Sequence, residues 1–498
     1  MKTRGSITVF FSLLLSVVLM VTDGFLISAK IAAGRAQIAN AADQAVYSQL
    51  AQYDSKMFDM YHLFFMDAGY GSNTLQLGKS LEEMESDLSY LFMPNKGSLL
   101  HRGVEFLDLQ EERGSITGYT LATDCGGKVF REQAVQYMKD TLGIQSVSAL
   151  YQRLSSQEKL IKQQESLAQQ ASEQESMEEY ERIKNEFMEN QNGPDSADVE
   201  QPVQSEQDRA TALETVKAMD AAVSLKKASI LKLVVPNPDS LSGWKEPSEG
   251  TLSDRVQNQG MGLIEIGEDA EGPVSEILFQ EYILKNLNHF RESRHETGPA
   301  YGVEYVLQGK TSDIKNLESI ANRLLLLRFG ANILHLYSDS LKRAEAQSLA
   351  LTVSSLLLVP EISPAIESAI IIGWAFAESL VDVRGLFSGD SVPLIKTADA
   401  WQVGFSDIPK LAGGIDAFRK SSGNTFYEDY LRLFLFIKSG ENKINRCMDV
   451  VEMSMRQLPG REYYSLDCLV DTIEVEFEVR SEKRKTFTVS KRESYRML

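Results

Sequence analysis

The sequence has 498 residues, of which 43% are hydrophobic and 24% charged, and its 51 Lys and Arg against 70 Asp and Glu give a formal net charge of −19. This length and apolar content exclude a disordered chain and allow about three domains of roughly 100 to 200 residues each. The acidic balance argues against nucleic acid as a partner, because phosphate binding needs a basic face and no block rich in Lys and Arg is present. Cys125, Cys447 and Cys468 are too few for a disulfide scaffold, although a bridge between Cys447 and Cys468 is left open.

The first informative segment is apolar and lies near the N-terminus. Residues 5–22 carry no charge, and the stretch from Ile7 to Val21 is interrupted only by Thr and Ser. As a helix, residues 5–22 are roughly 27 Å long, close to the hydrocarbon core of a bilayer at about 30 Å. The sequence therefore predicts one membrane-spanning helix in contact with membrane lipid. Its predicted anchor residues are Ile7, Phe10, Phe11, Leu14, Val18 and Val21.

A cleaved secretory signal is the alternative, because Lys2 and Arg4 form a basic region ahead of the apolar run. No well-formed Ala-x-Ala site follows the run at once, so a retained anchor is favoured. The same two cations and the terminal amine, against Lys30 and Arg35 beyond the span, favour a cytoplasmic N-terminus. We therefore expect a single-pass protein of the cell membrane with its body outside the cytoplasm.

The segment after the span is rich in alanine and contains no proline before Pro94. Since Ala is the best helix former, we expect the membrane helix to continue unbroken to about Tyr53. Small side chains recur along one side and permit the close approach of another helix. This predicted packing stripe consists of Ala29, Ala32, Ala33, Ala36 and Ala39. Periodicity alone leaves two interpretations open, in which the helix packs against other subunits or only against its own domain.

The chain divides into four predicted segments. Residues 1–54 form the anchor and Ala-rich helix, residues 55–126 a small mixed unit, residues 127–235 a helical arm and residues 236–498 the main core. The arm is predicted as an antiparallel helix pair with coiled-coil-like packing, interrupted by an acidic flexible loop near residues 188–208.

The main core is predicted to combine helices with strands. Val303, Tyr305 and Leu307 alternate with other residues as in a strand. Ser312 is the predicted N-cap of a helix that begins at Asp313.

The later part of the core predicts a helical hairpin and a small sheet. The helix from residue 313 has Gly330 as a candidate bend, and two apolar runs at 349–359 and 369–377 predict a buried helical hairpin. Residues 473–479 alternate apolar side chains with glutamates, so we expect an antiparallel strand pair with residues 487–489 that buries one face. The predicted fold class is α+β, predominantly helical, with a long N-terminal membrane helix, a small antiparallel sheet and a helical arm.

No catalytic motif has the required spacing. Lys310 and Thr311 resemble the end of a phosphate loop, but the leading glycine of that motif would have to occupy the position of Glu304. The five histidines have no spacing typical of metal ligands. The sequence therefore predicts no catalytic residue, no cofactor and no metal site, and we expect the protein not to be an enzyme.

One polar group stands out within an apolar helix. Glu378 and Asp382 share a helix face four residues apart, and Arg384 lies just beyond them. Two carboxylates on one face can serve as acid and base or hold a cation. They can equally form a structural polar cluster with Arg384, since buried charges need partners, and this interpretation is favoured.

Six stretches of the sequence resemble a large uncharacterised family of Gram-positive bacteria. They are RGSITVFFSLLLSVVLMVTDG, YDSKMFDMYHLFFMD, VEYVLQGK, NRLLLLR, WAFAESLVDVRGL and SVPLIKT. Members of this family look like companions of Tad-type (tight adherence) pilus systems, and the N-terminus is similar to TadE/TadG-like pseudopilins. The resemblance covers most of the chain, with residues 143–207 as its variable part. It implies an extracytoplasmic envelope protein that associates with other pilus or envelope subunits through its N-terminal helix, and it implies no catalytic residue.

The chain departs from the usual prepilin pattern at one position. A prepilin of the usual kind carries Glu five residues beyond the glycine at which it is processed, and counting from Gly5 that position is Phe10. The acid nearest to the span is Asp23, at its outer end. The departure counts against processing after Gly5 and against incorporation into a filament, and it leaves an assembly role outside the filament. The rival interpretations are an anchored extracytoplasmic enzyme, or a sensory or binding module, with a polar site around Glu378 and Asp382.

Overall fold

The structure is a computed structural model that divides into two compact units. The described residues are 4–92, 109–142, 144–173, 176–191, 205–247, 250–262, 272–411, 423–438, 440–481 and 486–496. Unit 1 consists of Met1–Asp140, Gly250–Gly272 and Val451–Leu498, and unit 2 consists of Thr141–Glu249 and Pro273–Val450. The chain thus leaves unit 1 twice and returns to it, whereas the four predicted segments are consecutive.

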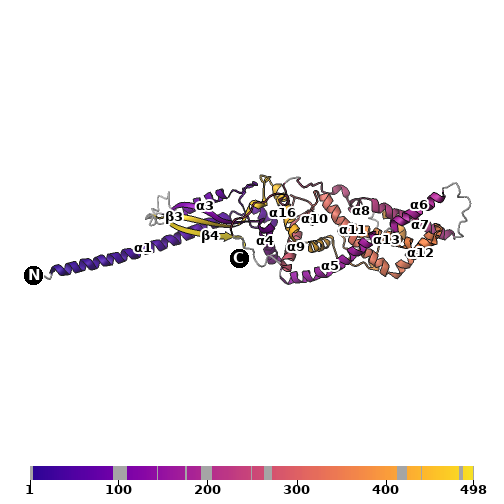
Figure 1. Cartoon of the computed structure of the whole chain (residues 1–498), viewed down its shortest axis with the longest axis horizontal. Helices are drawn as coiled ribbons and strands as arrows, with labels where there is room; N and C mark the ends of the chain where they lie inside the picture. Colours follow the sequence, from indigo (N-terminus) through magenta and orange to yellow (C-terminus); the bar gives the residue numbers. More distant parts are fainter. Residues whose placement is uncertain are drawn as a thin grey trace. The chain divides into compact units, whose positions relative to one another are not determined.

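Unit 1 begins with a helix of 47 residues, α1 (Arg4–Leu50). The predicted continuation of the membrane helix into the Ala-rich segment is confirmed, and the helix ends three residues before Tyr53. Figure 1 shows the N-terminal part of α1 extending beyond the other elements of its unit. Only the C-terminal part of α1 therefore packs within unit 1.

A four-stranded antiparallel sheet forms the centre of unit 1. Its strands are β1 (Met66–Asp67), β2 (Gln110–Leu121), β3 (Leu469–Arg480) and β4 (Thr486–Ser494). The long strand β3 pairs with β2 and, on its other edge, with β4 and β1. These pairings join residues that are far apart in the sequence, which explains why unit 1 is built from separate chain segments.

The predicted C-terminal strand pair is confirmed, and so is the burial of one of its faces. Val479 pairs with Phe487 and Phe477 pairs with Val489. The apolar side chains of β3 at alternate positions are fully buried, whereas Glu478 is exposed. Residues 482–485, between the two strands, lie outside the described residues.

Helices cover the apolar face of this sheet. The C-terminal part of α1 and helix α3 (Leu77–Phe92) pack together and contact β2, β3 and β4. The shared core includes Ala42 and Val46 of α1, Met84 and Leu88 of α3, and five side chains of β3. Two further helices, α2 (Ser55–Tyr61) and α4 (Asp124–Thr141), complete the regular structure of the first chain segment.

Unit 2 is a helical assembly. Its helices are α5 (Ile144–Glu173), α6 (Ser176–Gln191), α7 (Glu206–Lys227), α8 (Ile230–Val234), α9 (Pro273–Asn286), α10 (Gly302–Gln308), α11 (Asp313–Ser338), α12 (Ser340–Leu356), α13 (Ser363–Ser388), α14 (Ile408–Leu411) and α15 (Tyr427–Ile437). Helix α16 (Gly440–Arg456) contains the boundary between the two units. Helix α11 contacts α5, α10, α12 and α13, so it lies at the centre of this unit.

Several helix predictions are confirmed in unit 2. The hydroxyl of Ser312 accepts a hydrogen bond from the backbone N–H of Lys315 and caps α11. Helices α12 and α13 contact each other and form the predicted hairpin. With the small sheet of unit 1, these helices confirm the α+β, predominantly helical fold class.

The strand predicted around residues 303–307 is wrong, because this segment is helix α10. Every residue from Gly302 to Leu307 is buried. A helix that is surrounded by protein has no polar face, so its hydrophobic pattern carries no helical period. Gly309 ends the helix in the left-handed conformation, with φ of 61°.

The prediction of an acidic loop is wrong for its first part. Residues 188–191 belong to helix α6, and residues 206–208 belong to α7. Met177 and Tyr180 give α6 a buried side, and α6 packs against α13. Residues 192–204 lie outside the described residues. Helices α5, α6 and α7 pack against α11, α12 and α13 of their own unit, so these three helices are attached to the core.

Candidate functional site

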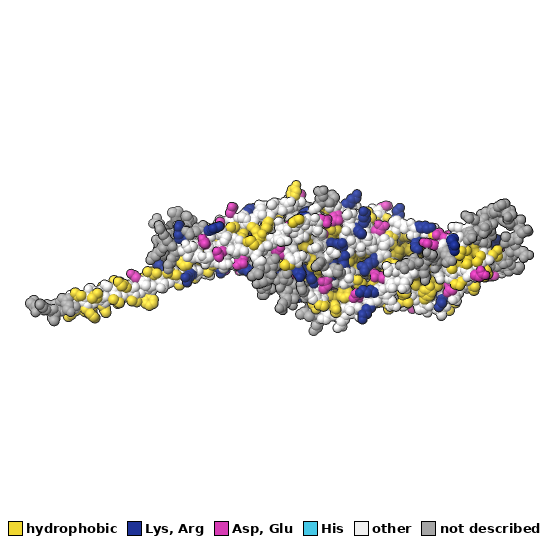
Figure 2. All heavy atoms as spheres, in the orientation of Figure 1, with side chains coloured by type: hydrophobic (Ala, Val, Ile, Leu, Met, Phe, Trp, Pro, Cys, Tyr) yellow, Lys and Arg dark blue, Asp and Glu magenta, His cyan; other side chains and the backbone are white. Residues whose placement is uncertain are grey.

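The N-terminal part of α1 exposes an unbroken apolar surface. The large apolar side chains from Ile7 to Ile27 are each between 43% and 74% exposed, and this range includes all six predicted anchor residues. Figure 2 shows hydrophobic side chains along the visible face of this segment. A patch of this size is unfavourable in water and marks a surface for contact with a membrane or with other proteins.

In the part of the chain that the structure describes, α1 is the one helix long and apolar enough to cross a membrane. Its most apolar 18-residue window is 0% buried in the structure. A core helix of a soluble protein would pass the same test of composition, but it would be buried. The exposure of this window therefore distinguishes α1 from the apolar core helix α13.

The middle of α1 has two sides with different surroundings. Ile38, Ala42 and Val46 are buried against the rest of unit 1. Four residues of the predicted packing stripe are exposed and the fifth is half-buried; they are Ala29, Ala32, Ala33, Ala36 and Ala39. At about 3.6 residues per turn, the stripe lies on the side of the helix opposite to the buried residues. Unit 1 therefore packs against one side of α1. The opposite side, which carries the packing stripe and is called the smooth side below, is left uncovered.

The predicted polar group on α13 is part of a closed cluster of charges, the buried cluster of Glu378, Asp382, Lys396 and Arg328. The Lys396 Nζ atom lies 2.5 Å from Glu378 Oε1 and 2.7 Å from Asp382 Oδ1. The Arg328 Nη2 atom, from α11, lies 3.0 Å from Asp382 Oδ2. All four side chains have 0% exposure. Two cations thus balance two carboxylates in the interior of unit 2.

Backbone and side-chain donors complete the buried cluster. The backbone N–H groups of Gln402 and Val403 donate to the Glu378 carboxylate, with the bond from Val403 at 2.8 Å. The Asn332 amide donates to Asp382 Oδ2 at 3.2 Å. Because these carboxylates are fully bonded and sealed from solvent, the arrangement joins α11, α13 and the segment that carries Lys396 rather than presenting reactive groups.

The two carboxylates of the buried cluster respond differently to burial. Burial raises the pKa of Glu378, and Lys396 offsets this only in part. Burial also opposes ionisation of Asp382, but Lys396 and Arg328 outweigh it and lower the pKa of Asp382 below its ordinary value. The doubly paired Asp382 therefore holds its negative charge more firmly than Glu378 does.

The structure brings together two of the three residues predicted for this group. Glu378 and Asp382 share Lys396, whereas Arg384 lies two residues beyond Asp382 on the same helix and so does not share its face. Sequence reasoning missed Lys396 and Arg328. Arg328 had a signal, since it is a charge within the apolar run of α11, and such a charge needs a partner. Lys396 follows an irregular segment, and no periodicity marked it.

The three cysteines are free thiols. Cys125 is exposed, whereas Cys447 and Cys468 are buried and belong to different units. Burial raises the pKa of the Cys468 thiol to about 12 and also raises that of Cys447. Since the thiolate is the reactive form, neither buried cysteine has the character of a nucleophile or a redox centre.

A second group of side chains has the composition of a metal site. Among the described residues, His289, Glu292 and Glu428 form a group whose potential ligand atoms all lie within 4.8 Å of one another. No sequence spacing indicated this group, because Glu428 is far along the chain from the other two residues.

These features define a mainly helical α+β protein with one N-terminal helix that is long and apolar enough to span a membrane. Residues 207–481, more than half of the chain, match a family of unknown function (DUF5702), and the chain belongs to this family. The matched range contains the buried cluster and the histidine group, and it does not contain α1. No curated protein and no solved structure matches the chain.

Proposed function

We propose that this protein is a membrane-anchored, pilin-like assembly component of a cell-envelope system of the Tad pilus or secretion type in Gram-positive bacteria. In this proposal α1 crosses the cell membrane once, and the rest of the chain lies outside the cytoplasm. The body presents a binding surface there, and α1 positions the subunit beside other subunits of the system.

The observation that carries the proposal is the continuity of α1. One helix of 47 residues has an exposed apolar half and a second half docked on the sheet and α3. Because the helix is continuous, the orientation of the membrane segment is fixed relative to the sheet on which α1 is docked. A flexible linker would not fix it. The exposed side of the second half carries small side chains, which favour close packing of helices.

The rival function, an anchored enzyme or binding module at Glu378 and Asp382, gains nothing from the geometry. Both carboxylates are completely buried and are bonded to Lys396, Arg328 and backbone N–H groups. A catalytic or binding site would need contact with a ligand from solvent.

The assembly role is tested by crosslinking in the expressing bacterium. A photoreactive residue in place of Asn40, which is exposed on α1 near the packing stripe, should give crosslinks to other subunits of the envelope system. The double substitution Ala32→Leu and Ala36→Leu should abolish them, because the larger side chains prevent close approach. The matched control, Ala32→Ser with Ala36→Ser, keeps the side chains small and should keep the crosslinks. Crosslinks that survive both leucines would contradict the proposal.

Anchorage and topology are tested separately. The full-length protein should stay in the membrane pellet after alkaline carbonate treatment, and Leu14→Arg should release it, because a cation at mid-bilayer costs about 3 kcal/mol or more. Protease added to cells without their wall should digest the body. Recovery of the intact protein from the soluble fraction, or full protection of the body, would overturn this part of the proposal.

A further inference from the structure

The turn that follows α9 holds two polar side chains in a fixed arrangement. The His289 N–H donates to the Glu292 carbonyl at 3.0 Å, and the Glu292 N–H donates to the His289 carbonyl at 2.9 Å. This double hydrogen bond closes a tight turn and pairs the two residues across it. The backbone atoms of His289 and Glu292 are therefore held next to each other.

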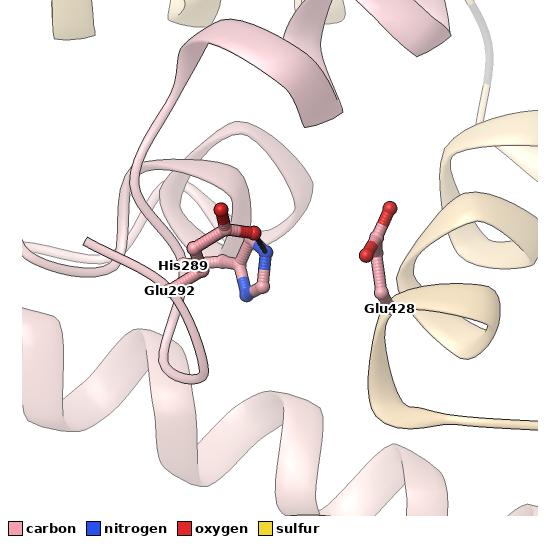
Figure 3. Close-up of side chains that lie close together, drawn as sticks. All are labelled: His289, Glu292 and Glu428. Carbon is pink, nitrogen blue, oxygen red and sulfur yellow. Dashed lines mark ion pairs between the residues drawn. The ribbon is translucent and has the colours of Figure 1, made fainter. Parts of the chain in front are cut away.

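Glu428 approaches the same point from another part of unit 2. It is the second residue of helix α15, and its carboxylate lies with the His289 ring and the Glu292 carboxylate within 4.8 Å. Figure 3 shows His289 and Glu292 on one turn, facing Glu428 at the start of its helix. The histidine side chain is 2% exposed, whereas the side chains of Glu292 and Glu428 are 49% and 40% exposed. The group is thus buried at the imidazole and open to solvent at the carboxylates.

The histidine has a buried nitrogen atom without a hydrogen-bond partner. His289 Nε2 is buried and makes no hydrogen bond in the structure. Its distance of 3.8 Å to Glu292 Oε2 is too long for one. A buried polar atom left unsatisfied costs roughly 1 to 3 kcal/mol. A ligand between the imidazole and the two carboxylates would give the Nε2 atom a partner and remove this cost.

The other ring nitrogen of His289, Nδ1, faces a backbone donor. The Arg291 N–H lies 3.3 Å from Nδ1, a long contact. If Nε2 binds a metal ion, the ring proton lies on Nδ1. The Nδ1 atom then no longer accepts this weak hydrogen bond from Arg291.

Each carboxylate is held by an arginine at one of its two oxygen atoms. Arg294 Nη2 lies 2.8 Å from Glu292 Oε2. Arg432 Nη2 lies 3.0 Å from Glu428 Oε1. Hydrogen bonds of this kind to ligating carboxylates are the usual outer shell of metal sites.

We propose that His289, Glu292 and Glu428 bind a divalent transition-metal ion, with zinc as the representative of the class. The donor set is one imidazole nitrogen and two carboxylate oxygens, and water would fill the remaining positions. Imidazole favours zinc and its neighbours over calcium and magnesium, which prefer oxygen ligands alone. Metal–ligand distances of about 2.0 to 2.2 Å require the donors to come closer than 4.8 Å. Glu292 is exposed and Glu428 is half-buried, so both side chains can make this movement. The bound ion would join the turn after α9 to the start of α15.

The proposal is tested with the full-length protein in detergent after treatment with EDTA. Equilibrium dialysis against Zn²⁺, with the metal measured by mass spectrometry, should give a site whose affinity falls at least tenfold in Glu428→Gln. This variant should fold normally because Glu428 is partly exposed at a helix start. His289→Gln should give the same loss. Loading with Co²⁺ should produce an absorption band that disappears in both variants.

The matched control is His335→Gln. The Nε2 atom of His335 is likewise buried and lies 3.7 Å from the Asp339 carboxylate, but no second carboxylate belongs to this pair among the described metal groups. Zinc affinity should be unchanged in this control. Native affinity in Glu428→Gln, or equal losses in the control, would overturn the proposed site, and binding of Ca²⁺ without Zn²⁺ would overturn the metal class. None of these measurements depends on the proposed assembly role.

Discussion

No side chain fits between Gly330 on α11 and Gln164 on α5. A Cβ atom at Gly330 would lie 2.0 Å from the Gln164 carbonyl oxygen and 2.7 Å from its carbonyl carbon. The two helices thus meet backbone against backbone at this point. The sequence marked Gly330 as a candidate bend, but α11 continues through it as one helix of 26 residues. The glycine is required by the contact with α5.

We expect Gly330→Ala to destabilise unit 2 by about 3 kcal/mol, because the obstructing atoms belong to the backbone and the helices must move apart. The control is Gly385→Ala in α13, where the added Cβ would meet Asp390 and Val392 at 3.8 and 3.9 Å, which are ordinary contact distances. That change should be neutral or stabilising by up to about 1 kcal/mol, since Ala favours helices. Urea midpoints of the detergent-solubilised protein measure both effects. Equal midpoints for the two variants would show that the helices separate at little cost.

Replacing Lys396 by Met should destabilise the protein by about 3 to 5 kcal/mol. The change leaves Glu378 and Asp382 buried with one cation fewer, and an uncompensated buried charge is costly. Lys410→Met is the matched control, because Lys410 is 71% exposed in its ion pair with Asp407 and should contribute less than about 1 kcal/mol. Chemical denaturation compares the two. A loss of the same small size in both variants would contradict the importance of the buried cluster.

The stability of unit 2 should depend on pH through Glu304. This side chain is fully buried on α10, and Tyr427 and the Phe290 N–H donate to Oε1 at 2.7 and 2.9 Å. Burial raises its pKa to about 7. Because the folded pKa exceeds the ordinary value of about 4.3, the folded state holds the proton more tightly. The stabilising contribution is complete below about pH 4 and is lost as pH rises through 7.

The comparison is with Glu304→Gln, which resembles the protonated acid at every pH. Relative to this variant, the native protein should lose roughly 3 kcal/mol between about pH 4.5 and 7.5. Denaturation midpoints across this range give the difference. A difference that does not change with pH would mean that Glu304 titrates normally.

A larger side chain should destabilise the protein on one side of α1 and have little effect on the other. Ala42 is fully buried against the sheet and α3, so Ala42→Leu should cost about 1 to 3 kcal/mol of stability. Ala36 is exposed on the other side of the helix, and Ala36→Leu should change stability by less than about 0.5 kcal/mol. Thermal unfolding in detergent measures both. Destabilisation by Ala36→Leu would show that the smooth side is covered within the folded chain.

Strand β3 and helix α1 were predictable because each has a clear pattern of apolar and polar residues. Strand β3 alternates because its glutamates lie on the less buried face, and α1 was recognisable because its apolar residues are not mixed with charges. Helix α10 was missed because protein surrounds it on all sides, so the pattern of its side chains reflects no solvent boundary. The acidic helix α6 was missed because two buried side chains, Met177 and Tyr180, were outnumbered by charges.

The candidate sites were predictable only where the partners share one helix. Glu378 and Asp382 are four residues apart, so helix geometry alone placed them together. Lys396 and Arg328 reach them from other segments, and a single sequence does not show which distant cation faces which carboxylate. The group of His289 and Glu428 depends in the same way on the packing of α15 near the turn after α9.

The nested arrangement of the two units sets the order in which the protein can be completed. Helix α1 leaves the ribosome before strands β3 and β4, which contact it, and all of unit 2 is synthesised in between. Helix α3 follows α1 closely in the chain and covers part of its buried side early in translation. The part of this cover that the two strands supply is absent from any product that terminates before residue 469.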